Sequence, residues 1–105
     1  MEFKFIIYEK SEGVATITLN RPETLNAFSK EVIEEVLQAV EDVKKDENVR
    51  VVVLTGAGEK AFSAGADIKA MKGMNALKAR ELSLMGEKLC VAFENLEKPV
   101  IAAIN

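Results

Sequence analysis

The stretch VRVVVLTGAGEKAFSAGADI, residues 49–68, decides the fold. It begins with an apolar, β-branched run, Val49 to Leu54, which favours a strand buried on both faces of a sheet. A loop rich in glycine and alanine follows, from Thr55 to Gly65. The small side chains at its end and at Ala66 leave the main chain open to close approach. The stretch therefore predicts a strand and then a loop that is either a compact turn or a binding surface.

The residues on both sides of this stretch predict an α/β fold. Short runs with a two-residue period indicate strands, and apolar residues spaced three and four apart indicate amphipathic helices. Ser29 is a candidate N-cap for the first helix, and a polar turn ending in Gly13 predicts a hairpin of the first two strands. The expected elements are strands 3–8 and 14–19, a helix 29–45, a strand 49–54, a short helical piece 67–72, a helix 76–96 and a buried strand 100–104.

Composition narrows the possible functions. The 105 residues have a net charge of −3, and no run of Lys or Arg is long enough to indicate a nucleic-acid partner. Cys90 is the only cysteine and there is no histidine, which excludes a disulfide framework, a Cys/His metal site and His-dependent catalysis within this chain. The opening residues MEFKFIIYEK suit neither a signal peptide nor a membrane span. We therefore expect a cytoplasmic protein with no metal and no membrane partner.

The glycine spacing after the predicted strand also fits a dinucleotide-binding loop. Gly56, Gly58 and Ala61 satisfy the G-x-G-x-x-[GA] pattern. That fingerprint requires a helix to begin inside the glycine motif, so that its free N–H groups face the pyrophosphate. Here the loop continues to Gly65, and the acid expected about twenty residues on, Glu81, falls in a helical pattern. A dinucleotide-binding βαβ unit that uses Gly56 and Gly58 is therefore the weaker alternative.

The segment FSAGADIKAM, residues 62–71, has two local interpretations. A helix that starts near Asp67 would place N–H groups without intrahelical partners beside a bare main chain. Such groups can stabilise a developing oxyanion. An ordinary loop-to-helix turn, with Asp67 as its cap, explains the same residues. The local pattern alone favours the ordinary turn over the oxyanion-binding loop.

Four segments together resemble the crotonase superfamily, the enoyl-CoA hydratases and isomerases. They are ITLNRPETLNAFS at 17–29, the stretch 49–68, FSAGADIKAM at 62–71 and EKPVIAAIN at 97–105. Their order and spacing also match those of the family. Within the family, the sequences of these segments are most similar to those of bacterial short-chain enoyl-CoA hydratases, also described as 3-hydroxybutyryl-CoA dehydratases. The resemblance implies that residues 1–105 are the amino-terminal part of the crotonase-like spiral of β-β-α repeats, an α/β fold.

The same resemblance implies roles for individual residues. The main-chain N–H of Ala66 would be one of two donors to the thioester oxygen, in an oxyanion hole. The carbonyl of Ala64 would help to hold the adenine of coenzyme A, Ala27 would contact the pantetheine, and Lys69 would lie near the ribose phosphate. The implied substrate-binding set is Ala27, Ala64, Gly65, Asp67, Ile68 and Lys69.

The implied reaction is the addition of water to a short-chain 2-enoyl-CoA thioester, with coenzyme A as part of the substrate and no separate cofactor. In the family two glutamates activate the water and deliver the proton, and they lie beyond the start of the third signature. The chain stops at Asn105, directly after an apolar strand. We therefore expect a fragment without turnover of its own, or a non-catalytic folding or assembly module. Family members are trimers or dimers of trimers, which implies a homo-oligomeric parent.

Overall fold

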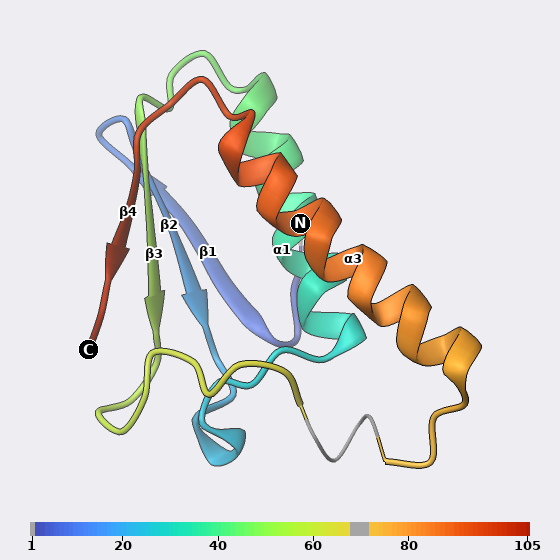
Figure 1. Cartoon of the computed structure of the whole chain (residues 1–105). Helices are drawn as coiled ribbons and strands as arrows, with labels where there is room; N and C mark the ends of the chain where they lie inside the picture. Colours follow the sequence, from blue (N-terminus) through green and yellow to red (C-terminus); the bar gives the residue numbers. More distant parts are fainter. Residues whose placement is uncertain (1, 68–71) are drawn as a thin grey trace.

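The computed structural model describes residues 2–67 and 72–105, which form a four-stranded sheet and helices on one of its faces (Figure 1). The elements are β1 Ile6–Ser11, β2 Val14–Leu19, the 3₁₀ turn η1 Pro22–Thr24, α1 Lys30–Lys45, β3 Val51–Gly56, α3 Ala76–Glu94 and β4 Val100–Ala103. The strand order is β1-β2-β3-β4; β1 and β2 are antiparallel, whereas β3 is parallel to both its neighbours. The parallel pairs are connected through α1 and α3, which confirms the predicted α/β class.

The predicted hairpin is confirmed, but its turn is shorter than predicted. β1 starts at Ile6 and runs to Ser11, three residues later than the predicted range 3–8. Only Glu12 and Gly13 form the turn, and both have positive φ, 51° and 83°. Positive φ at both turn residues gives the turn the twist that a two-residue hairpin needs. The polar residues before the turn can pair with β2 because one face of β1 is in solvent.

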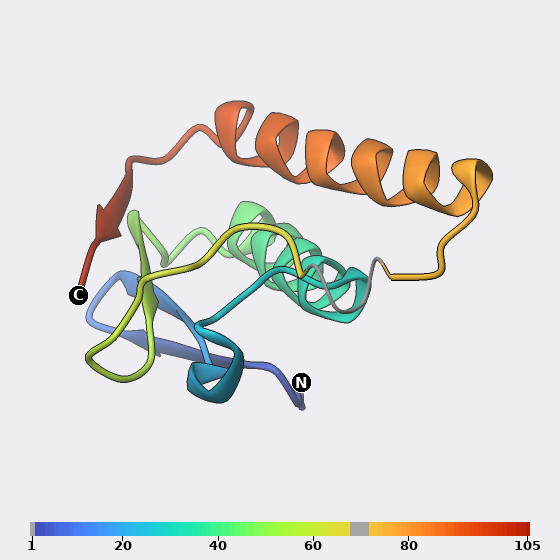
Figure 2. The same ribbon diagram turned by 60° about the horizontal axis from the view of Figure 1, so that its bottom comes forward.

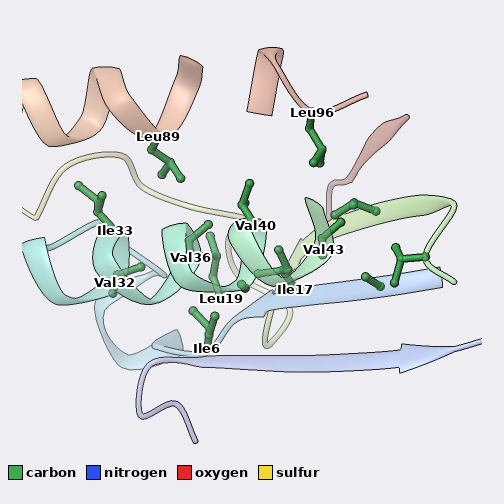
Figure 3. Packing of buried hydrophobic residues seen from close by; sticks show 14 residues of the cluster. Ile6, Ile17, Leu19, Val32, Ile33, Val36, Val40, Val43, Leu89 and Leu96 are labelled. Atoms are coloured by element: carbon green, nitrogen blue, oxygen red, sulfur yellow. The ribbon is translucent and has the colours of Figure 1, made fainter. Parts of the chain in front are cut away.

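Helix α1 lies between the sheet and α3 (Figure 2). Its predicted apolar stripe is confirmed, since Val32, Val36 and Val43 are at most 2% exposed. Ile17 and Leu19 of β2 lie on the sheet side of α1, and residues of α3 approach its other side (Figure 3). The predicted N-cap is also confirmed: the Ser29 hydroxyl accepts a hydrogen bond from the Val32 N–H at 3.3 Å. The core thus forms where α1 is buried between the sheet and α3.

The last two strands are less buried than predicted. β3 begins at Val51 rather than at residue 49, and Val52 is its only buried residue apart from Gly56, while Val51 and Val53 are half-buried. The predicted burial of β4 is wrong, because Ile101 is 53% exposed. Both helices cover the same face of the sheet, and within the described residues no strand pairs beyond β4. One face of β3 and the outer edge of β4 therefore remain open.

Helix α3 begins where predicted and ends two residues earlier, at Glu94. The Asn75 side chain caps it by accepting a hydrogen bond from the Lys78 N–H at 2.8 Å. The predicted helical piece 67–72 falls mostly on residues 68–71, which lie outside the described residues. Within the described ranges, no helix is long and apolar enough to cross a membrane.

An ionic cluster joins β1 to the end of α1. The Lys10 ammonium lies 2.7 Å from Asp42 Oδ2 and 2.8 Å from Asp46 Oδ2, and the Tyr8 hydroxyl donates to Asp42 at 2.7 Å. The hydrogen bonds from Lys10 are the largest cause that lowers the pKa of both carboxyls. A hydrogen bond from Tyr8 lowers the pKa of Asp42 further, and one from a main-chain N–H lowers that of Asp46. Burial, followed by the bond to Asp42, raises the pKa of Tyr8. The cluster therefore depends on ionised carboxylates.

This cluster predicts an acid-sensitive part of the stability. A carboxyl whose pKa is lower in the folded state stabilises the fold above its unfolded pKa, and this contribution is lost as pH falls through the folded value. We expect Lys10→Met to destabilise the chain at pH 7 and to have a smaller effect at a pH below about 3.9, the ordinary pKa of Asp, because the carboxylates lose their charge as pH falls through their lowered folded pKa values. Urea denaturation at both pH values measures the difference. Lys45→Met is the control, since Lys45 is an exposed residue with only a 3.6 Å contact to Glu41. An equal effect of Lys10→Met at both pH values would contradict the prediction.

Candidate functional site

The loop after β3 is irregular throughout its described part, and no helix begins at residues 56–61. The dinucleotide alternative required a helix there, so the structure removes its support. Gly56 has a different explanation: a β-carbon at this position would lie 2.8 Å from Asn26 Nδ2 and 3.0 Å from the Ala61 carbonyl oxygen. Contacts with the Asn26 side chain and with carbonyls of the loop itself therefore account for this glycine.

The end of the loop pairs with the segment before α1. Residues 64–67 lie beside residues 25–28, and Phe28 and Ala66 form a parallel bridge. The bonds are Ala64 N–H to the Leu25 carbonyl (2.9 Å), Phe28 N–H to the Gly65 carbonyl (2.7 Å) and Asp67 N–H to the Phe28 carbonyl (2.8 Å). Two loops far apart in the sequence thus form one short ladder.

The main-chain N–H of Ala66 points away from this ladder. The N–H of Phe28 donates to the carbonyl of the residue before Ala66, and the carbonyl of Phe28 accepts from the N–H of the residue after it. In a parallel bridge the N–H and carbonyl of the residue opposite therefore lie on the other edge of its segment. Ala66 is exposed, and its N–H has no acceptor among residues 2–67 and 72–105. The fold thus presents one main-chain donor at this point.

An ion pair holds the end of the ladder. Arg21 Nη1 lies 3.3 Å from Asp67 Oδ2, and the two side chains are only 19% and 11% exposed. The Arg21 guanidinium also lies over the ring of Phe5, 5.2 Å from its centroid. Asp67, which the resemblance places in the substrate-binding set, is directed toward Arg21.

An apolar pocket of about 570 Å³ lies next to the Ala66 donor. Gly65 and Ala66 contribute to its wall, and α3 forms another side through residues that include Gly86. Other lining residues are Phe28, Leu54, Phe62, Leu82 and Phe93. No carboxylate lines the pocket within the described part of the chain. The pocket therefore suits an apolar group attached to a hydrogen-bond acceptor.

The structure brings only part of the predicted set together. Gly65 and Ala66 line the pocket, whereas Ala27 is buried, Ala64 is exposed, and neither is among the lining residues. Ile68 and Lys69 lie outside the described residues. In the ranges that the structure does describe, no group of three or more His, Cys, Asp or Glu residues could hold a metal ion.

Sequence reasoning missed Asn26. This residue is only 2% exposed and has φ of 56°, next to Leu25 at 55°. Its side chain accepts from the Arg21 N–H (2.9 Å) and donates to the carbonyls of Ala57 (3.0 Å) and Ala61 (2.9 Å). Its position between Leu25 and Ala27 in an otherwise apolar run was the available signal, because asparagine tolerates positive φ better than most residues.

The fold and the site define an α/β protein that offers a main-chain donor beside an apolar pocket, an arrangement that suits a polarised carbonyl with an apolar substituent. The family described as "Enoyl-CoA hydratase/isomerase" matches residues 9–105. The chain belongs to this family, as the sequence resemblance indicated.

Individual relatives agree with this assignment. The chain is 46% identical over 105 residues to the short-chain-enoyl-CoA hydratase of Clostridium acetobutylicum and 43% identical to the crotonyl-CoA hydratase of Syntrophomonas wolfei. It covers 40% of each of these relatives, while they match 100% of this chain. The crystal structure of an enoyl-CoA hydratase from Bacillus anthracis matches 97% of this chain with a TM-score of 0.94 and 41% identity, again over 40% of its own length. The fold is therefore that of the crotonase-like proteins, over the part that this chain spans.

Proposed function

We propose that residues 1–105 supply the thioester-binding part of a short-chain enoyl-CoA hydratase. The observation that carries this proposal is the main-chain N–H of the exposed residue Ala66, which has no acceptor in the described residues and adjoins an apolar pocket of about 570 Å³. The names of the relatives support the same substrate class, short-chain enoyl-CoA thioesters.

In this proposal the Ala66 N–H donates to the thioester oxygen. Attack of water on the double bond moves negative charge onto that oxygen, so the hydrogen bond strengthens as the enolate-like state forms. The aromatic and aliphatic side chains of the pocket, such as Phe62 and Leu82, surround the short acyl chain and exclude water from it. The chain thus binds and polarises the thioester.

Proton transfer requires groups from outside this pocket wall. No Asp or Glu lines the pocket within the described residues, and general acid–base catalysis of hydration needs such groups. In the family resemblance two glutamates and a second main-chain donor perform these steps. The contacts of Ala27, Ala64 and Lys69 with coenzyme A, the homo-oligomeric parent and its cytoplasmic location belong to the same proposal.

A titration followed by amide NMR tests the proposal. Butyryl-CoA is added to one sample and S-butyl-CoA, the thioether that lacks the carbonyl oxygen, to another. We expect the Ala66 amide proton to shift downfield with the thioester alone, and the thioester to bind about fivefold more tightly, the value of one neutral hydrogen bond. With crotonyl-CoA we expect no loss of the enoyl absorbance.

Two results would count against the proposal. Equal shifts of the Ala66 amide with both ligands would show that its N–H does not contact the carbonyl. Hydration of crotonyl-CoA by the 105-residue chain would show that the acid and base lie within these residues, contrary to the expectation that the chain alone has no turnover.

A further inference from the structure

Asn26 connects two loops that lie far apart in the sequence. Its carbonyl oxygen accepts from the Arg21 N–H at the start of the turn around η1. Its amide nitrogen donates to two carbonyls of the loop after β3, those of Ala57 and Ala61. Asn26 is 2% exposed, and the three hydrogen bonds of its side chain use its carbonyl oxygen and both amide protons. Such a buried and fully bonded amide restricts the relative movement of the two loops.

The glycine at position 56 makes room for this amide. A β-carbon there would come within 2.8 Å of Asn26 Nδ2, closer than nonbonded atoms allow, and it would also collide with the Phe62 carbonyl. Gly56 does not need a positive φ, since it is absent from the residues that have one. Space for the Asn26 side chain and the loop carbonyls is therefore the reason for a glycine at this position.

The Asn26 side chain and the Ala66 donor belong to one hydrogen-bonded unit. Asn26 follows Leu25, whose carbonyl accepts from Ala64, and it precedes Phe28 by two residues. Phe28 makes the bridge that directs the Ala66 N–H away from the ladder. The direction of that donor thus depends on residues 25–28, and Asn26 attaches these residues to the loop that leads into 64–67.

We propose that Asn26, placed over Gly56, is the positioning residue that orients the Ala66 N–H for the thioester oxygen. The inference rests on the proposed function, because it names the residue that sets the geometry of that same site. Asn26 itself does not line the apolar pocket and contacts no reacting atom in this proposal. Its effect passes through the ladder, where an error of a few tenths of an ångström in donor placement weakens the bond to the carbonyl.

Two variants separate the side chain from its backbone conformation. Asn26→Gly tolerates φ of 56° and removes all three side-chain bonds. Asn26→Asp is isosteric, keeps the acceptor for Arg21 and replaces the two donated bonds by repulsion from the Ala57 and Ala61 carbonyls. Asn48→Ala is the matched control, because Asn48 is exposed and its side chain makes no hydrogen bond among the described residues.

The first measurement needs no ligand. Amide hydrogen exchange of Phe28 and Asp67 reports the opening of the ladder, and Val36 in α1 reports the stability of the core. In Asn26→Gly and Asn26→Asp we expect the protection of both ladder amides to fall at least about tenfold relative to Val36, the equivalent of losing the two donated bonds. In the wild-type chain the Asn26 side-chain amide should show the same protection as the ladder amides, a result that does not depend on any variant folding.

The second measurement is the ratio of affinities for butyryl-CoA and S-butyl-CoA. We expect the wild-type chain and Asn48→Ala to prefer the thioester about fivefold, and both Asn26 variants to lose this preference while still binding the thioether. If the wild-type chain shows no preference, the proposed function fails. If the wild-type chain prefers the thioester, and the Asn26 variants keep both this preference and the protection of the ladder amides, Asn26 is not a positioning residue. Equal destabilisation of the ladder and the core would likewise reduce Asn26 to a structural role.

Discussion

Replacement of Ile17 by alanine is expected to lower the free energy of unfolding by about 3 kcal/mol. Ile17 is fully buried in β2, on the face that α1 covers (Figure 3). It sits between Tyr8 of β1 and Leu54 of β3 in the sheet register. Its loss would leave a cavity that the strands on either side cannot close, because ladder hydrogen bonds hold them in place. Urea denaturation followed by circular dichroism measures the change.

Ile7→Ala is the matched control for this experiment. Ile7 lies in β1 and is 40% exposed, so the same truncation there should cost less than about 1 kcal/mol. Comparable losses for the two variants would mean that the packing of α1 on β2 does not dominate the stability of the chain.

The order of the elements could be predicted from the sequence because it depends on local periodicity. The valine stripe of α1 and the cap at Ser29 are local features, and the structure has both. Exposure of the last strand was harder to predict, since an apolar run such as the one containing Ile101 indicates burial by composition alone. Whether such a strand is covered depends on which elements lie beside it, and the order of the strands in the sheet determines these neighbours.

The site was predictable only in part, for the same reason. The small residues at 64–66 indicate a bare main chain, but the direction of the Ala66 N–H results from its bridge to Phe28, 38 positions earlier. The Arg21–Asp67 pair and the bonds of Asn26 are equally remote in sequence. Pairing between distant loops follows from tertiary structure, so neither periodicity nor a short motif reports it.

A hybrid enzyme gives the largest expected functional effect. Residues 1–105 would replace the 40% of the Syntrophomonas wolfei crotonyl-CoA hydratase that they match at 43% identity. We expect the hybrid to hydrate crotonyl-CoA, and Ala66→Pro in it to lower kcat about 100-fold, the effect of removing one oxyanion donor. Proline keeps a small side chain but has no N–H, and no bond of the ladder uses the Ala66 N–H. The loss of enoyl absorbance under saturating substrate measures kcat.

Ala76→Pro provides a control with the same chemical change. Ala76 is the first residue of α3, directly after the N-cap Asn75, whose ψ of 172° is compatible with a following proline. This variant should keep the kcat of the parent hybrid within about twofold, since an N–H in the first turn has no intrahelical acceptor. An inactive parent hybrid would contradict the claim that these residues supply the thioester site. If the parent hybrid is active and its Ala66→Pro and Ala76→Pro variants have the same kcat, then the Ala66 N–H does not stabilise the transition state, although it adjoins the pocket.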